Sequence, residues 1–185
     1  MIASITGPII YKALDHVVVE AGGLGYKVFV TSSALEAYAP RAVVTLLTHL
    51  VVREDSQALY GFVSREELSL FGKLLGVSGV GPRMALAIIS SGQVADLISA
   101  ISRGDSAIFT TISGIGKKTA ERIIVELKSS VIDLAGADGG QDSSDIIEAL
   151  VSLGYNRHEI RSILNQIPAS VPLDAKLKEA LKLLG

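Results

Sequence analysis

The sequence predicts an α+β chain of several domains: an N-terminal β-barrel, a central all-α domain and a C-terminal three-helix bundle. Residues 1–63 are rich in β-branched and aromatic residues, whereas helical periodicity begins at residue 64 and continues to 130. A stretch at 131–143, dominated by Gly, Ala and Asp from Ala135 onward, has no period and predicts a flexible linker before the bundle at 144–185.

Strand-like runs fill the first part, and five of them in so short a segment favour a small closed barrel of the OB-fold type. We expect these strands at residues 2–13, 16–21, 25–31, 43–52 and 57–62. Gly22, Gly23 and Gly25 predict the turn of a hairpin between the second and third runs. A short helix that starts at a serine cap is expected in SSALEAYA.

The central part opens with Ser64 as a predicted N-cap and Glu67 three residues later, which is the pattern of a capping box. Further helices are expected through LSLFGKLL, within VSGVGPRMALAIISS, around QVADLISAIS, near SAIFTTI and within SGIGKKTAERIIVELKSS. In the last part, SDIIEALVSLG, NRHEIRSILNQI and PLDAKLKEALKLL predict three short amphipathic helices.

Composition restricts the chemistry that the chain can perform. It has no cysteine, which excludes disulfides and thiolate metal sites, and its three histidines lack the spacing of metal ligands. No apolar run reaches the ~18 residues of a membrane span, and the start lacks the pattern of a signal peptide. We therefore expect a cytoplasmic protein with no membrane partner, no metal and no cofactor.

Charge is distributed unevenly along the chain. Residues 63–130 carry 8 Lys and Arg against 6 Asp and Glu, whereas residues 1–62 carry 4 against 5 and residues 131–185 carry 5 against 8. The central part alone is positive. If this part binds nucleic acid, it does so through a few placed contacts rather than a basic sheath.

The central part contains one short phrase twice. VSGVGPRMALAII, residues 77–89, recurs 35 residues later as ISGIGKKTAERII. In each copy two glycines flank an apolar residue, Val80 or Ile115, which we expect to lie under the turn as a plug. Glycine permits positive φ, and the unpaired N–H groups of the helix that follows form an anion site together with the helix dipole.

These features predict that both copies bind DNA phosphates. The predicted residues are Gly79, Gly81 and Arg83 in the first copy and Gly114, Gly116, Lys117, Lys118 and Arg122 in the second. Two such turns can hold both strands of a duplex across its minor groove without reading its sequence. The alternative is a helix–helix connection in which glycine serves packing alone. The phrase fails the patterns of ATPase and dinucleotide loops, so no ATP hydrolysis is expected.

A second signal is VVREDSQALYGF, where Glu54 and Asp55 stand between two strand-like runs. Asp and Ser favour turns, so an ordinary polar hairpin tip is one interpretation. Two adjacent carboxylates would also repel phosphates, increasingly so as water is excluded. Such an acidic pin suits a place where DNA strands must be kept apart.

Four stretches in chain order now make a specific pattern: MIxxIxG at the start, VVREDSQALYGF, SGVGPRMALAII and GIGKKTAERIIVELK. Together they resemble the RuvA family, the bacterial Holliday-junction-binding subunits of the RuvAB branch migration complex. The match runs from residue 1 to about 130, and the C-terminal bundle adds the ALVSLGY stretch.

The resemblance implies an OB-fold barrel, two helix-hairpin-helix motifs and a mobile C-terminal domain. It implies a homotetramer around a four-way junction, or two tetramers on one junction, with Glu54 and Asp55 as the acidic pin at the centre. The C-terminal domain would dock RuvB, a hexameric ATPase motor, with the RuvC resolvase in the same complex. The chain itself would be a non-catalytic subunit in DNA recombination and in repair during the SOS response to DNA damage.

Leu150, Leu153 and Tyr155 are candidate apolar anchors for that motor, although each of them is equally suited to fill a small three-helix core. Other functional classes remain open at this point. In a DNA glycosylase of the helix-hairpin-helix type an Asp follows the hairpin; Asp133 lies 19 residues after Gly114, but in the predicted linker. A nuclease would have only Glu54 and Asp55 for metal. A general duplex-binding module would show no preference for branched DNA.

Overall fold

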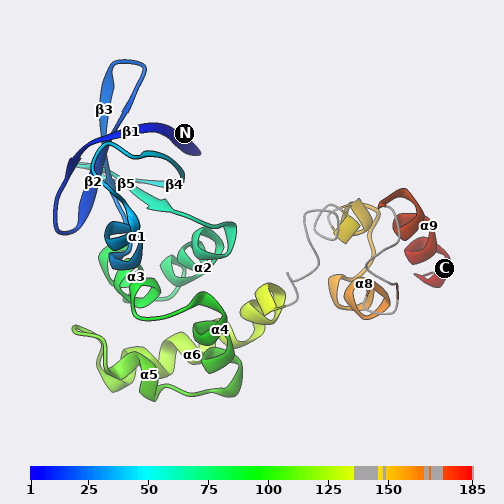
Figure 1. The fold of residues 1–185 in the computed structure, drawn as a ribbon. Helices are drawn as coiled ribbons and strands as arrows, with labels where there is room; N and C mark the ends of the chain where they lie inside the picture. The colour runs from blue at the N-terminus through cyan, green and yellow to red at the C-terminus, as the bar shows by residue number, and fades with distance from the viewer. Residues whose placement is uncertain (136–145, 148, 165–166, 168–172, 185) are drawn as a thin grey trace. The chain divides into compact units, whose positions relative to one another are not determined.

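The structure is a computed structural model that describes residues 1–135, 146–147, 149–164, 167 and 173–184. The chain divides into two compact units, Met1–Leu134 and Ala135–Gly185, and each is described here by itself (Figure 1). The first unit holds a β-barrel followed by helices, and the second holds short helices.

The barrel is made of β1 (Ser4–Lys12), β2 (His16–Ala21), β3 (Leu24–Phe29), β4 (Val43–Val52) and β5 (Gln57–Phe62). These strands close in the order β1-β2-β3-β5-β4, which confirms the predicted five-stranded barrel. The pairings are antiparallel except for β3 with β5, which is parallel. Three of the strands, β2, β4 and β5, have the bounds expected from the sequence.

Alternation along the strands builds the barrel core, because successive side chains of a strand point to opposite faces. In β2 and β3 the valines Val17, Val19 and Val28 are fully buried, while their neighbours are exposed or half-buried. The short helix α1 (Ser32–Ala37) connects β3 to β4 and adds Ala34 to the same core.

Two local details of the barrel differ from the sequence-based expectation. Gly22 and Gly23 both have positive φ and alone form the hairpin turn, because Gly25 already pairs with Glu20 inside the ladder. Helix α1 is capped by Thr31 rather than by a serine: the Thr31 side chain accepts a hydrogen bond from the Ala34 N–H.

The helical part of the first unit continues directly from β5. Its helices are α2 (Arg65–Leu75), α3 (Pro82–Ser90), α4 (Val94–Arg103), α5 (Ala107–Thr110) and α6 (Lys117–Ala135). The predicted cap is confirmed, since Ser64 Oγ accepts from the Glu67 N–H at 3.2 Å. The Glu67 carboxylate in turn accepts from the N–H of Val63, one residue before the usual partner in a capping box.

Aromatic side chains join the barrel to these helices. Phe71 of α2 is fully buried, and its ring lies 4.8 Å from that of Phe62 and 5.2 Å from that of Tyr60, measured between centroids. The two strand-end rings therefore belong to the same core as the helices. This shared core fixes the position of the helical hairpins relative to the end of the barrel.

Helix α6 is longer than the sequence pattern suggested. We expected a linker from residue 131, but the helix continues to Ala135. Val131 is fully buried in the helical core, and this tertiary contact holds the added residues, which end where the Gly- and Asp-rich composition begins. The remainder of the predicted linker, residues 136–143, lies outside the described residues.

The second unit contains α8 (Arg157–Leu164), α9 (Leu173–Leu184) and a preceding helical stretch whose described residues are 146–147 and 149–152. Among the described residues of this unit, the buried apolar side chains are Ile146, Leu150, Ile160, Ile167 and Ala180. These residues form a core of their own, in agreement with the predicted three-helix bundle.

Within the described part of the chain, no single helix is long and apolar enough to cross a membrane. Among the described helices, only the consecutive α3 and α4, taken together, reach the length and apolar composition of a membrane span, and they are bent by 103° relative to each other.

Candidate nucleic-acid interface

Two turns of matching shape precede α3 and α6. Gly79 has φ of 87° and Gly114 has φ of 88°, a region that a residue with a Cβ enters only at a steric cost. The same pair of backbone hydrogen bonds holds each turn. In the first turn, the N–H of Val80 donates to the Val77 carbonyl and that of Ala85 to the Gly81 carbonyl. In the second turn, the matching bonds run from Ile115 to Ile112 and from Ala120 to Gly116.

The apolar residue between each pair of glycines fills the space beneath its turn. Val80 is 6% exposed and Ile115 is 4% exposed, and both belong to one buried cluster. The predicted plugs are therefore confirmed. Both turns are anchored in a common core, so their outer surfaces keep a fixed relation to each other.

The helix starts leave backbone donors available to a ligand. Helix α3 begins at Pro82 with Gly81 as its N-cap, and no side chain caps it. The first turn of a helix has N–H groups without intrahelical partners, and the helix dipole favours a negative charge there. A Cβ added to Gly81, Gly114 or Gly116 would meet nothing within 4 Å, so an anion can approach these backbones closely.

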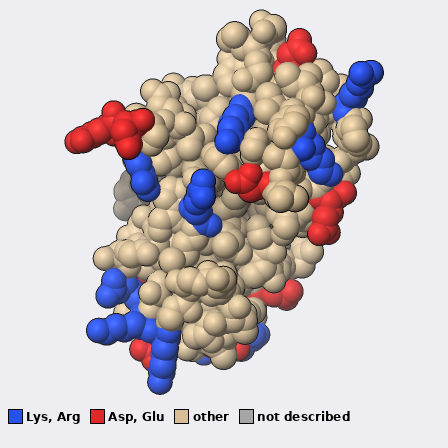
Figure 2. Space-filling view, turned by 90° about the vertical axis from the view of Figure 1, so that its left-hand side faces the viewer, with Lys and Arg blue, Asp and Glu red and all other residues tan. Residues whose placement is uncertain are grey.

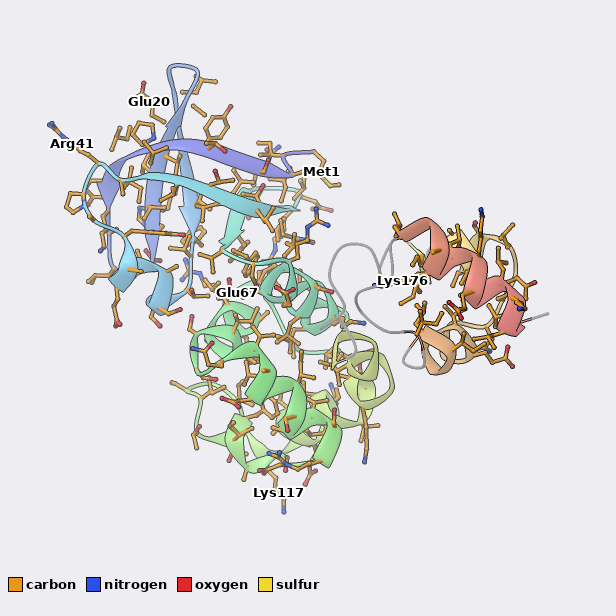
Figure 3. All side chains as sticks on the ribbon, turned by 45° about the vertical axis from the view of Figure 1, so that its right-hand side comes forward. Met1, Glu20, Arg41, Glu67, Lys117 and Lys176 are labelled. Atoms are coloured by element: carbon orange, nitrogen blue, oxygen red, sulfur yellow. The ribbon has the colours of Figure 1, made fainter. Side chains whose placement is uncertain are left out.

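Cationic side chains surround the second turn. Lys117 and Lys118 are exposed at the start of α6, and Lys117 reaches Glu121 only at 4.0 Å. Figure 3 places Lys117 at the end of the first unit farthest from the barrel. Figure 2 shows Lys and Arg side chains gathered at the same lower end of the face it presents. A phosphate at this turn would thus meet both backbone donors and positive charge.

Arg122 does more than the sequence suggested. Its Nη1 donates to the Ser78 carbonyl oxygen at 3.0 Å and lies 3.4 Å from Ser78 Oγ, while the Ser78 N–H donates to Glu126 Oε2 at 3.4 Å. Two side chains of α6 thus hold the turn of the first copy, an arrangement we call the α6 clasp. No spacing rule links residues 78 and 122, so this contact could not be predicted from the residue pattern.

The predicted acidic pair occupies the tip of the β4–β5 hairpin. Glu54 and Asp55 are both exposed there, and the tip is closed by a hydrogen bond from Arg53 N to Ser56 O at 2.8 Å. The Ser56 hydroxyl donates to the Asp55 carboxylate at 3.1 Å. The two carboxylates project from a short, well-defined turn, as a pin requires.

Comparison with known proteins covers the whole chain. Family models match in order: the RuvA N-terminal domain at residues 1–61, a SAM-like helix-hairpin-helix tandem at 71–129 and the RuvA C-terminal domain at 141–185. A relative in Methylibium petroleiphilum is 43% identical over 191 residues, and one in Leptothrix cholodnii is 43% identical over 192; each alignment covers 100% of both chains. A third, in Delftia acidovorans, is 41% identical over 193 residues with the same coverage. The chain belongs to the RuvA family. Each of these relatives carries the name Holliday junction branch migration complex subunit RuvA.

The RuvA C-terminal region contains the three candidate anchor residues, and they differ in how far they are buried. Leu150 is fully buried in the core of the second unit, so the expectation of an exposed anchor there is wrong. Leu153 is 63% exposed, and Tyr155 is half-buried beside the core. The Tyr155 N–H donates to the Leu150 carbonyl at 3.1 Å, which closes the turn after the helix.

Proposed function

We propose that this chain binds four-way DNA junctions and acts as the non-catalytic DNA-binding subunit of a branch migration complex. The observation that carries the proposal is the pair of matched turns on one core, in a chain that also presents a carboxylate pin. The printed name of its full-length relatives supports the same role.

In this proposal the backbones around Gly79, Gly81, Gly114 and Gly116 hold phosphates of the duplex arms. Arg83, Lys117 and Lys118 add positive charge, and Arg122 adds charge while holding the first turn. The contacts are to phosphates, so binding follows the shape of the junction rather than its sequence. Glu54 and Asp55 repel the backbones at the crossover and keep the exchanging strands apart.

Four copies would surround one junction, with a second tetramer able to close on the opposite face. The second unit would dock RuvB, the hexameric ATPase motor, and Leu153 and Tyr155 are candidate anchors on its surface. RuvC resolvase would act in the same complex. The place of action would be the cytoplasm, in recombination and DNA repair.

A mobility-shift competition tests the proposal. A labelled four-way junction competes with an equal mass of linear duplex, without ATP and at moderate salt. We expect a strong preference for the junction in a discrete, slow band. Equal affinity for both DNAs would instead assign the chain to the general duplex-binding modules, and the pin would lose its role.

A further inference from the structure

A groove that borders the first repeated turn has the character of a binding site. It has a volume of about 590 Å³ and lies between the outer face of the barrel and the start of α3. Val28 and Leu59 point into the barrel core, so Phe29 and Tyr60 beside them stand on the outer face of β3 and β5. The volume falls in the ~300–1,000 Å³ range of small-ligand sites.

The wall of the groove is aromatic. The rings of Phe29 and Tyr60 stack with centroids 5.4 Å apart and an interplanar angle of 27°. Phe29 remains half-buried, whereas Tyr60 is packed against Phe71 of α2. Phe29 is thus the ring that the groove offers to a ligand, supported from behind by a rigid stack.

Three cations line the same groove: Lys27, Arg53 and Arg83. Lys27 Nζ lies 5.0 Å and Arg83 Cζ 5.8 Å from the centroid of Phe29, within the range of cation–π attraction. Among the described residues none of the three has a carboxylate oxygen within 4 Å. Positive charge therefore gathers around an aromatic wall without a direct ion pair to a described carboxylate.

The neighbouring titratable groups are consistent with this charge. A hydrogen bond with His16 is the main cause that lowers the pKa of Asp15, and Lys27 and Arg83 lower it further. Asp15 is committed to His16, whose Nδ1 lies 2.6 Å from Asp15 Oδ1. Burial raises the pKa of Tyr60, and the charges of Arg83 and Arg53 oppose that rise.

The lining of the groove indicates its occupant. It includes Arg53 and Ser56 at the base of the acidic pin, and Gly81 and Arg83 at the helix start. A strand parted from its partner at the pin would meet a phosphate-binding helix start after crossing this groove. Base stacking on an aromatic ring combined with cations along the backbone is how proteins hold single strands.

We propose that the groove receives an unpaired nucleotide of a DNA strand leaving the crossover, with its base against Phe29 and its phosphate among Lys27, Arg53 and Arg83. This inference rests on the proposed function, because only a junction that is being opened presents such a strand. The groove would then act together with the pin: the carboxylates separate the two strands, and the groove binds one of them.

The test compares three fluorescent DNAs by anisotropy with the full chain: a short oligothymidylate, a linear duplex and a four-way junction. Phe29→Leu keeps an apolar side chain but removes the ring, and should lower oligothymidylate affinity by about fivefold or more. Its affinity for linear duplex should stay within about twofold of the unmodified chain, because the duplex contacts lie at the two turns.

Arg53→Gln provides the second variant, at an exposed turn where folding is not at stake. It should weaken oligothymidylate binding and reduce the salt dependence by the ~0.7 expected for one lost single-strand phosphate contact. Arg41→Gln is the matched control: the same charge change on a barrel loop away from the helical part, as Figure 3 shows. It should leave oligothymidylate affinity unchanged.

Two results would overturn the inference. One is oligothymidylate binding that neither Phe29→Leu nor Arg53→Gln weakens. The other is an equal loss of oligothymidylate and duplex, which would make the groove part of the duplex surface. If the proposed function itself were wrong, a different result would show it: the unmodified chain would bind the four-way junction no more tightly than the linear duplex.

Discussion

At the scale of single residues, the charged side chains of the pin and of the α6 clasp differ in how far the fold depends on them. Glu54 and Asp55 are exposed at a hairpin tip and support no core. Arg122 is exposed as well, but its guanidinium is already bonded to Ser78. The first pair can be altered without structural cost, whereas the arginine cannot.

Neutralising the pin with Glu54→Gln and Asp55→Asn together should leave junction affinity unchanged or make it tighter, because repulsion of phosphates is removed. Branch migration driven by the motor should change. Affinity is measured by mobility shift and migration by release of labelled arms. Loss of junction binding in the double variant would mean that these residues have a structural role instead.

Replacing Arg122 by Lys keeps the positive charge but removes the planar group that reaches Ser78. We expect a loss of about 1 kcal/mol of unfolding free energy, the typical contribution of a hydrogen bond, and weaker binding of junction and duplex alike. Chemical denaturation and mobility shift measure the two effects. Lys118→Arg, an exposed exchange with no such contact, is the control; equal behaviour of the two variants would show that charge alone matters at residue 122.

At the scale of elements, the turn before each helix combines two separable requirements. Gly114 needs positive φ, whereas Gly116 does not and has open space around it. The first glycine therefore serves the shape of the turn. In the proposed function, the second leaves room for a phosphate to approach the backbone.

The pair Gly114→Ala and Gly116→Ala should separate folding from binding. Alanine at 114 should destabilise the fold by about 1–2 kcal/mol, the cost of the left-handed region for a residue with a Cβ. Alanine at 116 should leave stability unchanged and weaken DNA binding, because its methyl group stands where a phosphate would come close. Thermal denaturation and duplex affinity provide the two measurements. Full DNA affinity in Gly116→Ala would contradict the predicted phosphate contact at this turn.

The element scale also shows how far the sequence could predict the structure. The strands with clear alternation and flanking turn residues, such as 43–52, were predicted with their observed bounds, and so was the shape of the repeated turns. The end of α6 was not, because the burial of Val131 is a tertiary contact that local composition does not contain. The α6 clasp and the aromatic groove were missed for the same reason: Ser78 and Arg122, or Phe29 and Arg83, meet only in three dimensions.

At the scale of the whole molecule, each of the two units has a buried core of its own, and the proposed DNA-binding and motor-docking roles fall on different cores. Among the residues whose burial the structure describes, Val131 is the last in the core of the first unit and Ile146 the first in the core of the second. We therefore expect each unit to keep its own core when the other is removed.

Deleting residues 136–185 should leave a folded chain that binds junctions, while stimulation of the RuvB motor is lost. Deleting residues 131–185 should in addition destabilise the chain, because Val131 leaves the core. Junction affinity, motor-driven migration and thermal denaturation distinguish these outcomes. Motor stimulation that persists without residues 136–185 would remove the docking role from the second unit.

The plugs beneath the two turns have one more consequence. Since Val80 and Ile115 are buried in the same cluster, opening either turn exposes part of the core that supports both. Local opening is then a shared event, and the amide protons of both turns should exchange with deuterated solvent at similar rates. The two grips on a duplex would form and fail together, so that an arm of the junction is either held on both strands or released.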